Sequence, residues 1–212
     1  MSILSNMSFH FDLNFTEEEK KRSQEYLERK TIYYAEEIFN QKIKVYVDIY
    51  DGSVLVRIGI IGSIYIAIGQ YADFRSGIDQ IIQDTRIIQN VIESTLNKNG
   101  IPEDCLIKKQ KLIATPEKIR RLFLRIDRLE KNTLNKDEYQ KELNIILKNV
   151  IQITYEMDKQ DLKTLLLELK EEYRPEPKYL PEEFKDIKIN DNTHKVYTEV
   201  LPFFMAEREK VG

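Results

Sequence analysis

The alternation of apolar and polar residues predicts both strands and a helix in the first fifty positions. Residues 1–15 indicate a ragged start or an edge strand, because FHFDLNF alternates over a short reach. Thr16 stands before three glutamates, which predicts the start of a helix whose apolar stripe continues to about Phe39. Residues 42–50, KIKVYVDIY, alternate again and predict a half-buried strand.

One segment has a different pattern: residues 54–72, VLVRIGIIGSIYIAIGQYA, in which Arg57 is the only charged residue. Five of the seven glycines lie in or beside it, and the turn signal Asp51-Gly52-Ser53 precedes it. Two continuations are open. The β-branched residues favour a second hairpin strand for the first few positions, whereas Ser53 could cap a helix. From about Ile58 onward we favour a helix.

On such a helix the small residues would gather on one face and the isoleucines on the other. Faces of this kind let helices approach closely in a bilayer. Residues 58–72 would reach about 22 Å as a helix, which is shorter than the roughly 30 Å hydrocarbon core. Arg57 would then lie at an interface or line a wet pore; in a soluble core element it would point to water. The candidate membrane or gate residues are Arg57, Gly59, Gly62, Ser63, Ala67 and Gly69.

The rest of the chain reads as helical until prolines become frequent. Apolar residues close to heptad spacing predict a helix over 74–98. Thr115-Pro116-Glu117 predicts the start of a helix that continues to about Lys131. Another begins near Asn135 and continues, with a candidate break at Met157, to Tyr173. Four of the six prolines follow, which predicts a mostly extended tail.

These elements predict a mainly α fold: a helical bundle with a short N-terminal β-strand or hairpin and one glycine-rich apolar helix, a transmembrane candidate. The predicted parts are a helix-plus-strand portion, the glycine-rich segment, a helical oligomerisation or sensing domain and a proline-rich docking tail, over residues 1–53, 54–72, 73–173 and 174–212.

Charge is distributed unevenly, although the net charge is only −3. Residues 108–131 carry nine positive side chains against three acidic ones. Four of the positive residues share one face of the predicted helix and could hold phosphates or anionic lipid heads. The alternative is a solvated face paired with acidic neighbours such as those of residues 168–172. No aromatic platform interleaves with these residues, and the candidate polyanion site consists of Lys118, Arg121, Arg125 and Arg128.

Motifs for catalysis are missing from the chain. It has one cysteine, two distant histidines and no phosphate-loop, dinucleotide or serine-hydrolase motif. We therefore expect no catalytic activity, no cofactor, no metal and no small-molecule substrate. The first fifteen residues lack a basic segment followed by an apolar one, so we expect no secretory signal.

The order of segments around the glycine-rich run adds a resemblance. Asp51-Gly52-Ser53, the run itself and Phe74-Arg75-Ser76-Gly77-Ile78-Asp79 together resemble small membrane effectors of bacterial anti-phage defence loci, in particular the channel effector of the Hailong system. The resemblance implies a homo-oligomeric membrane gate that a bound single-stranded oligonucleotide holds shut. Only the membrane role of the run is carried over by position.

Two functional hypotheses follow. The first is a non-enzymatic, homo-oligomeric, pore-forming effector of the bacterial inner membrane, in contact with the lipid bilayer and regulated by an oligonucleotide. The alternative is a soluble, cytoplasmic, α-rich interaction module that binds nucleic acid or a protein partner.

Overall fold

A computed structural model describes residues 2–50, 54–69, 71, 73–98, 101 and 103–181. The chain divides into two compact units, residues 1–120 and 121–212.

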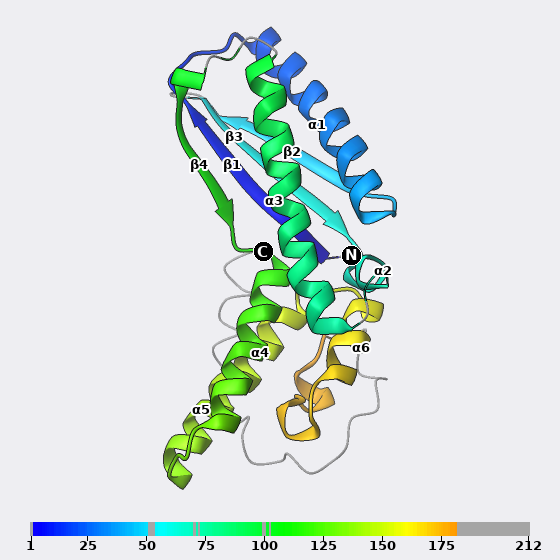
Figure 1. Ribbon diagram of the computed structural model, residues 1–212, viewed down its shortest axis with the longest axis vertical. Helices are drawn as coiled ribbons and strands as arrows, with labels where there is room; N and C mark the ends of the chain where they lie inside the picture. The colour runs from blue at the N-terminus through cyan, green and yellow to red at the C-terminus, as the bar shows by residue number, and fades with distance from the viewer. Residues whose placement is uncertain are drawn as a thin grey trace. The chain divides into compact units, whose positions relative to one another are not determined.

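The first unit is built on a four-stranded antiparallel sheet (Figure 1). The strands lie in the order β2-β3-β1-β4, and every neighbouring pair is antiparallel. This is the split β-α-β arrangement of ferredoxin-like folds, which says nothing about function by itself. The elements, in chain order, are β1 (Ser2–Phe11), α1 (Glu17–Phe39), β2 (Lys44–Tyr50), β3 (Val54–Gly62), α2 (Ile64–Ile68), α3 (Phe74–Lys98), the short 3-10 turn η1 (Glu103–Cys105) and β4 (Leu106–Leu112).

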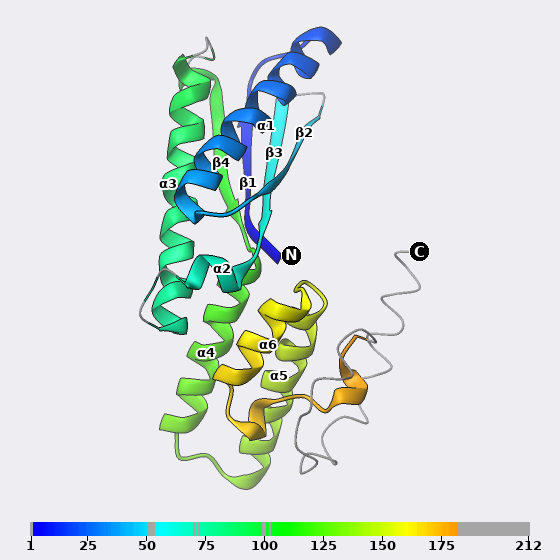
Figure 2. The same cartoon turned by 90° about the vertical axis from the view of Figure 1, so that its right-hand side faces the viewer.

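Helices α1 and α3 contact each other and lie on the same side of the sheet (Figure 2). Alternate residues of the strands point toward them and form the core, including the fully buried Met7, Phe9 and Ile58. Helix α1 contributes a buried residue every fourth position, which places one stripe against the sheet. The opposite side of the sheet faces away from both helices.

Several elements agree with the sequence-based predictions. Thr16 caps α1 with a capping box that includes Glu19, as the three glutamates indicated. Strand β2 and helix α3 occupy their predicted ranges. Strands β2 and β3 pair in antiparallel fashion, as the hairpin alternative required. The turn residues 51–53 lie outside the described residues.

The prediction of a mainly α bundle with a glycine-rich apolar helix is wrong. Residues 54–62 form β3, which pairs with β2 on one side and β1 on the other. Ser63 then caps α2, which is only five residues long. Isoleucine and valine favour strands. An interior strand can be apolar on both faces, so a mostly apolar run without clear alternation fits an interior strand as well as a buried helix.

Two further strands differ from the predictions. Strand β1 is an interior strand rather than an edge, because it pairs with both β3 and β4. Strand β4 covers Leu106–Leu112, where the sequence suggested only a basic segment. Its lysines hide the alternation on which a strand prediction depends.

Helix α4 (Thr115–Lys131) crosses the boundary between the units. The second unit continues with α5 (Lys136–Thr154), α6 (Lys159–Glu168) and the 3-10 turns η2 (Glu171–Tyr173) and η3 (Pro177–Tyr179). Helix α5 begins directly after Asn135, which caps it, and the chain breaks between α5 and α6 around Met157, so the predicted start and break are confirmed. Helix α6 ends at Glu168, before the predicted end at Tyr173. Buried residues of this unit include Phe123, Ile146 and Leu165.

Among the described residues, none of the helices combines the length and the apolar composition needed to cross a membrane. The predicted tail can be followed only to residue 181, and the remainder of it lies outside the described residues.

Candidate functional site

The side of the sheet away from α1 and α3, here called the open face, is set by the strand register. Residues directly opposite in antiparallel strands point to the same side. Tyr46 lies opposite Gly59, Asp48 opposite Arg57, and Tyr50 opposite Leu55. Strands β1 and β4 continue these rows, so the open face also carries Asn6, Ser8, His10, Lys108, Gln110 and Leu112.

Arg57 lies on an interior strand and its side chain is nevertheless exposed, which shows that the middle of the open face reaches solvent. Its guanidinium carbon is 5.1 Å from the centre of the Tyr50 ring. This is a cation–π arrangement between diagonal neighbours on β3 and β2. Tyr50 is still 45% exposed, so the ring keeps area for a further contact.

Tyr46 lies across the sheet because Gly59 leaves room for it. A Cβ atom on Gly59 would be 1.8 Å from Cε1 of Tyr46 and 2.3 Å from its hydroxyl oxygen. Glycine within a strand marks such a close approach. Burial, and next the charge of Asp48, raise the pKa of Tyr46.

The charges of the open face differ from those of the whole chain. Among the described residues of the four strands, the exposed cations on this face are Lys44, Arg57 and Lys108, and the exposed acid is Asp48. The chain as a whole is acidic, with a net charge of −3. Half-buried His10 lies beside Lys108 in the same row. The face thus joins local positive charge to two tyrosine rings.

The predicted gate residues do not form one helical face. Arg57, Gly59 and Gly62 belong to β3, and Ser63, Ala67 and Gly69 belong to α2 and its two ends. A Cβ on Gly62 would be 2.7 Å from the Cδ1 atoms of both Ile43 and Leu4, so this glycine serves core packing. Ser63 accepts a hydrogen bond from the amide of Ile66, which is a helix cap. The single face of small residues that the sequence predicted does not form, because residues 54–62 are a strand and only residues 64–68 are a helix.

The predicted polyanion residues do lie on one helix, α4. Arg121 and Arg128 are exposed, and Lys118 is half-buried. Arg125 forms an ion pair of 2.9 Å with Glu142 of α5 and lowers the pKa of that carboxyl. One of the four cations is thus neutralised by an acidic neighbour.

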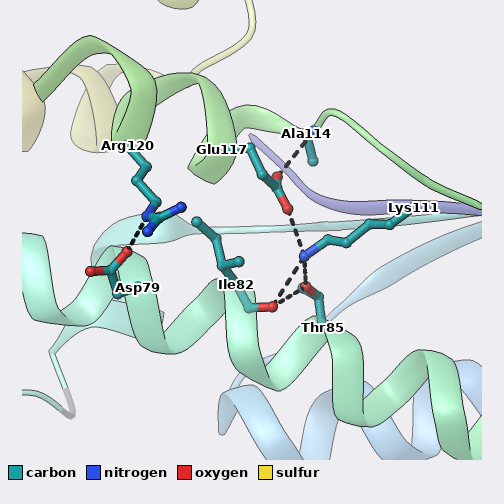
Figure 3. Close-up of polar contacts among 7 residues, drawn as sticks. All are labelled: Asp79, Ile82, Thr85, Lys111, Ala114, Glu117 and Arg120. Carbon is teal, nitrogen blue, oxygen red and sulfur yellow. Dashed lines mark hydrogen bonds and ion pairs between the residues drawn. The ribbon is translucent and has the colours of Figure 1, made fainter. Parts of the chain in front are cut away.

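Other basic residues of this segment are also paired (Figure 3). Nζ of Lys111 is 2.6 Å from Glu117 and donates a hydrogen bond of 2.5 Å to Thr85. Glu117 also accepts a hydrogen bond from the amide of Ala114, just before α4. Arg120 contacts Asp79 of α3 at 2.7 Å. These contacts join β4, α3 and the start of α4.

In the part of the chain that the structure describes, no group of three or more histidine, cysteine or acidic side chains is placed to hold a metal ion. Comparison with protein-family models, curated proteins and solved structures gives no match to this chain. Function therefore has to be argued from the geometry alone.

Sequence reasoning missed the open face as a site. The alternation over residues 42–50 placed Lys44, Tyr46, Asp48 and Tyr50 on one side of a strand, which was a usable signal. From about Ile58 onward its partner residues were assigned to a helix, so Gly59 could not be placed beside Tyr46, and the position of Arg57 was left open between a hairpin strand and a helix.

Proposed function

We propose that this chain is a nucleic-acid-binding module and that the open face of its sheet is the binding surface. The observation that carries the proposal is the exposed Arg57 in the middle of the sheet, 5.1 Å above the Tyr50 ring. Phosphates of nucleic acids bind cationic side chains, and unpaired bases stack on aromatic rings and on guanidinium planes. Lys44 and Lys108 supply further cations on opposite edge strands.

The face also has the form that this function needs. Four-stranded sheets of RNA-binding modules present aromatic side chains on an open surface. Here the rings come from the edge strand β2 rather than from the interior strands, so the parallel concerns the chemistry of the surface and not a family.

Helix α4 is the competing surface on this chain. Arg125 is paired with Glu142, and Arg120 with Asp79, so part of its charge is already neutralised. The open face is favoured because it places a ring and a cation in contact.

The pore-forming function stays a prediction, and so do homo-oligomeric assembly, the inner-membrane location, the contact with a bilayer and the lack of catalytic activity. The apolar helix that motivated the pore is a strand followed by a five-residue helix. What the proposal retains from both earlier hypotheses is the oligonucleotide as ligand.

Fluorescence anisotropy with a labelled single strand of about 12 nucleotides, a length within the usual site sizes of single-strand binders, tests the proposal at low salt. Arg57→Gln should weaken binding at least about fivefold, because a charged contact of roughly 1 kcal/mol or more is lost. Arg121→Gln is the matched control on α4 and should leave the affinity within about twofold.

Equal affinity of Arg57→Gln and the wild type would contradict the proposal. So would a loss confined to Arg121→Gln, which would place the ligand on α4. Thermal unfolding of both variants shows whether the fold is retained.

A further inference from the structure

We infer that the open face selects single strands and takes one base onto the Tyr46 ring, which Gly59 allows to lie flat on the sheet. This inference rests on the proposed nucleic-acid-binding function and names the class of ligand for the same site. It assigns a role to Gly59, a residue that has no side chain to offer a ligand.

The first step is the position of the Tyr46 ring. The atoms at the far end of the ring, Cε1, Cζ and the hydroxyl oxygen, all lie within 2.3 Å of where a Gly59 Cβ would be. The ring therefore covers the backbone of β3 with one face. Tyr46 is only half-buried, so part of the side chain remains accessible. A flat ring over a strand is the form of a stacking platform.

The second step is the spacing of the two rings. Tyr46 and Tyr50 are four residues apart on β2, or about 13 Å along an extended strand. One base cannot contact both rings at this distance. Arg57 lies opposite Asp48, in the row between them, and leans over Tyr50. The arrangement fits a chain with successive bases, one for Tyr46 and one for Tyr50 with Arg57.

The open face should not bind a double helix through base stacking. In a double helix the bases are paired and stacked on one another, and their faces are not available to a protein side chain. A single strand can turn its bases onto the sheet while its phosphates meet Lys44 and Arg57. Stacking tolerates any base, since every base has an aromatic face. We therefore expect little dependence on base sequence.

The experiment compares three ligands of equal length: a mixed-sequence single strand, the same backbone without bases, and the duplex. The protein variants are Tyr46→Phe, Tyr46→Leu and Gly59→Ala, and binding is read by anisotropy. Loss of one stacked base weakens binding by about 5- to 150-fold. The wild type should bind the abasic strand and the duplex more weakly by at least the lower value.

The variants separate the contribution of the ring from that of its hydroxyl group and from that of Gly59 beneath it. Tyr46→Phe keeps the ring and should bind the normal strand like the wild type. Tyr46→Leu and Gly59→Ala should both bind it more weakly, while their affinity for the abasic strand stays unchanged. Gly59→Ala acts by moving the ring, because the added methyl would occupy its place.

Equal binding of the normal and abasic strands by the wild type would overturn the stacking inference and leave the proposed function standing. Absence of binding to any strand would instead contradict the proposed function itself. Wild-type affinity in Gly59→Ala, with the fold retained by circular dichroism, would overturn the role of Gly59. Should Gly59→Ala fail to fold, Tyr46→Leu against Tyr46→Phe decides the role of the ring.

Discussion

At the scale of single residues, two glycines of the same strand have opposite surroundings. Gly59 lies on the open face under the movable end of a tyrosine, whereas Gly62 is enclosed by the core residues Ile43 and Leu4. A sequence shows only that both are glycine. Their neighbours across the sheet decide whether a methyl group would be tolerated.

This contrast predicts different stabilities for the two alanine variants. Gly59→Ala should change the free energy of unfolding by less than about 1 kcal/mol, because alanine is favoured over glycine in strands while the displaced ring moves into solvent. Gly62→Ala should cost about 1–3 kcal/mol, as overpacking of a core usually does. Urea unfolding monitored by circular dichroism measures both, and a larger loss in Gly59→Ala would contradict the assignment of faces.

Tyr71 gives a prediction at high pH. Burial, and next its hydrogen bond of 2.9 Å to Asp84, raise the pKa of Tyr71 to about 12. A pKa above the unfolded value near 10 means that the fold prefers the neutral phenol. The resulting stabilisation is complete below about pH 10 and is lost as the pH rises toward 12. The stability difference between wild type and Tyr71→Phe should therefore shrink over this window, and a constant difference would refute the shifted pKa.

At the scale of elements, the partly buried ion pair between β4 and the start of α4 is the clearest polar link in the first unit. Lys111 and Glu117 have side chains only 19% and 17% exposed. The same ammonium also contacts Thr85 of α3. Such a pair positions a helix start more firmly than an exposed pair does.

A double-mutant cycle with Lys111→Met and Glu117→Gln measures this link. The coupling energy should lie between about 0.5 and 3 kcal/mol, the range for residues in one network. The control is Arg22 with Glu18, whose side chains are 75% and 73% exposed, and its coupling should stay below about 0.5 kcal/mol. Equal coupling in the two cycles would mean that the Lys111 pair is an ordinary surface contact.

The starts of helices could be predicted from the sequence more fully than strand β3 could. Helix starts at Thr16 and Asn135 were recognisable because each cap is local chemistry between a side chain and an amide three residues away. The first positions of strand β3 were favoured as a hairpin strand, but its continuation to Gly62 was not recognisable, because that depends on β1 and β2 beside it. An apolar run with glycines suits a membrane helix and an interior strand equally well.

The candidate site could not be predicted from the sequence for the same reason. Arg57 was singled out as the only charged residue of its segment, but its contact with Tyr50 exists only through the pairing of two strands. The cations of α4 were visible in the sequence, whereas the pairing of Arg125 with Glu142 was not. Local sequence patterns predict helices and strands. A site built from several of these elements can be predicted only when the way they pair is also known.

At the scale of the whole molecule, an acidic chain is proposed to bind a polyanion through a locally positive face. The face has three exposed cations, so a few phosphates at most are neutralised. For about three phosphate contacts on a single strand, the logarithm of affinity should fall with the logarithm of salt with a slope near −2. Titrations at several salt concentrations give this slope. A slope near zero would contradict phosphate contacts, and one far steeper would require more cations than the open face holds.

Photo-crosslinking of a single strand to the full chain, followed by mapping of the attached peptide by mass spectrometry, shows whether the open face is the binding surface. We expect attachment within residues 44–61, at Tyr46 or Tyr50, and loss of the Tyr46 crosslink in Tyr46→Leu. Attachment confined to α4, or no attachment under conditions where the strand is bound, would contradict the assignment of the open face as the binding surface.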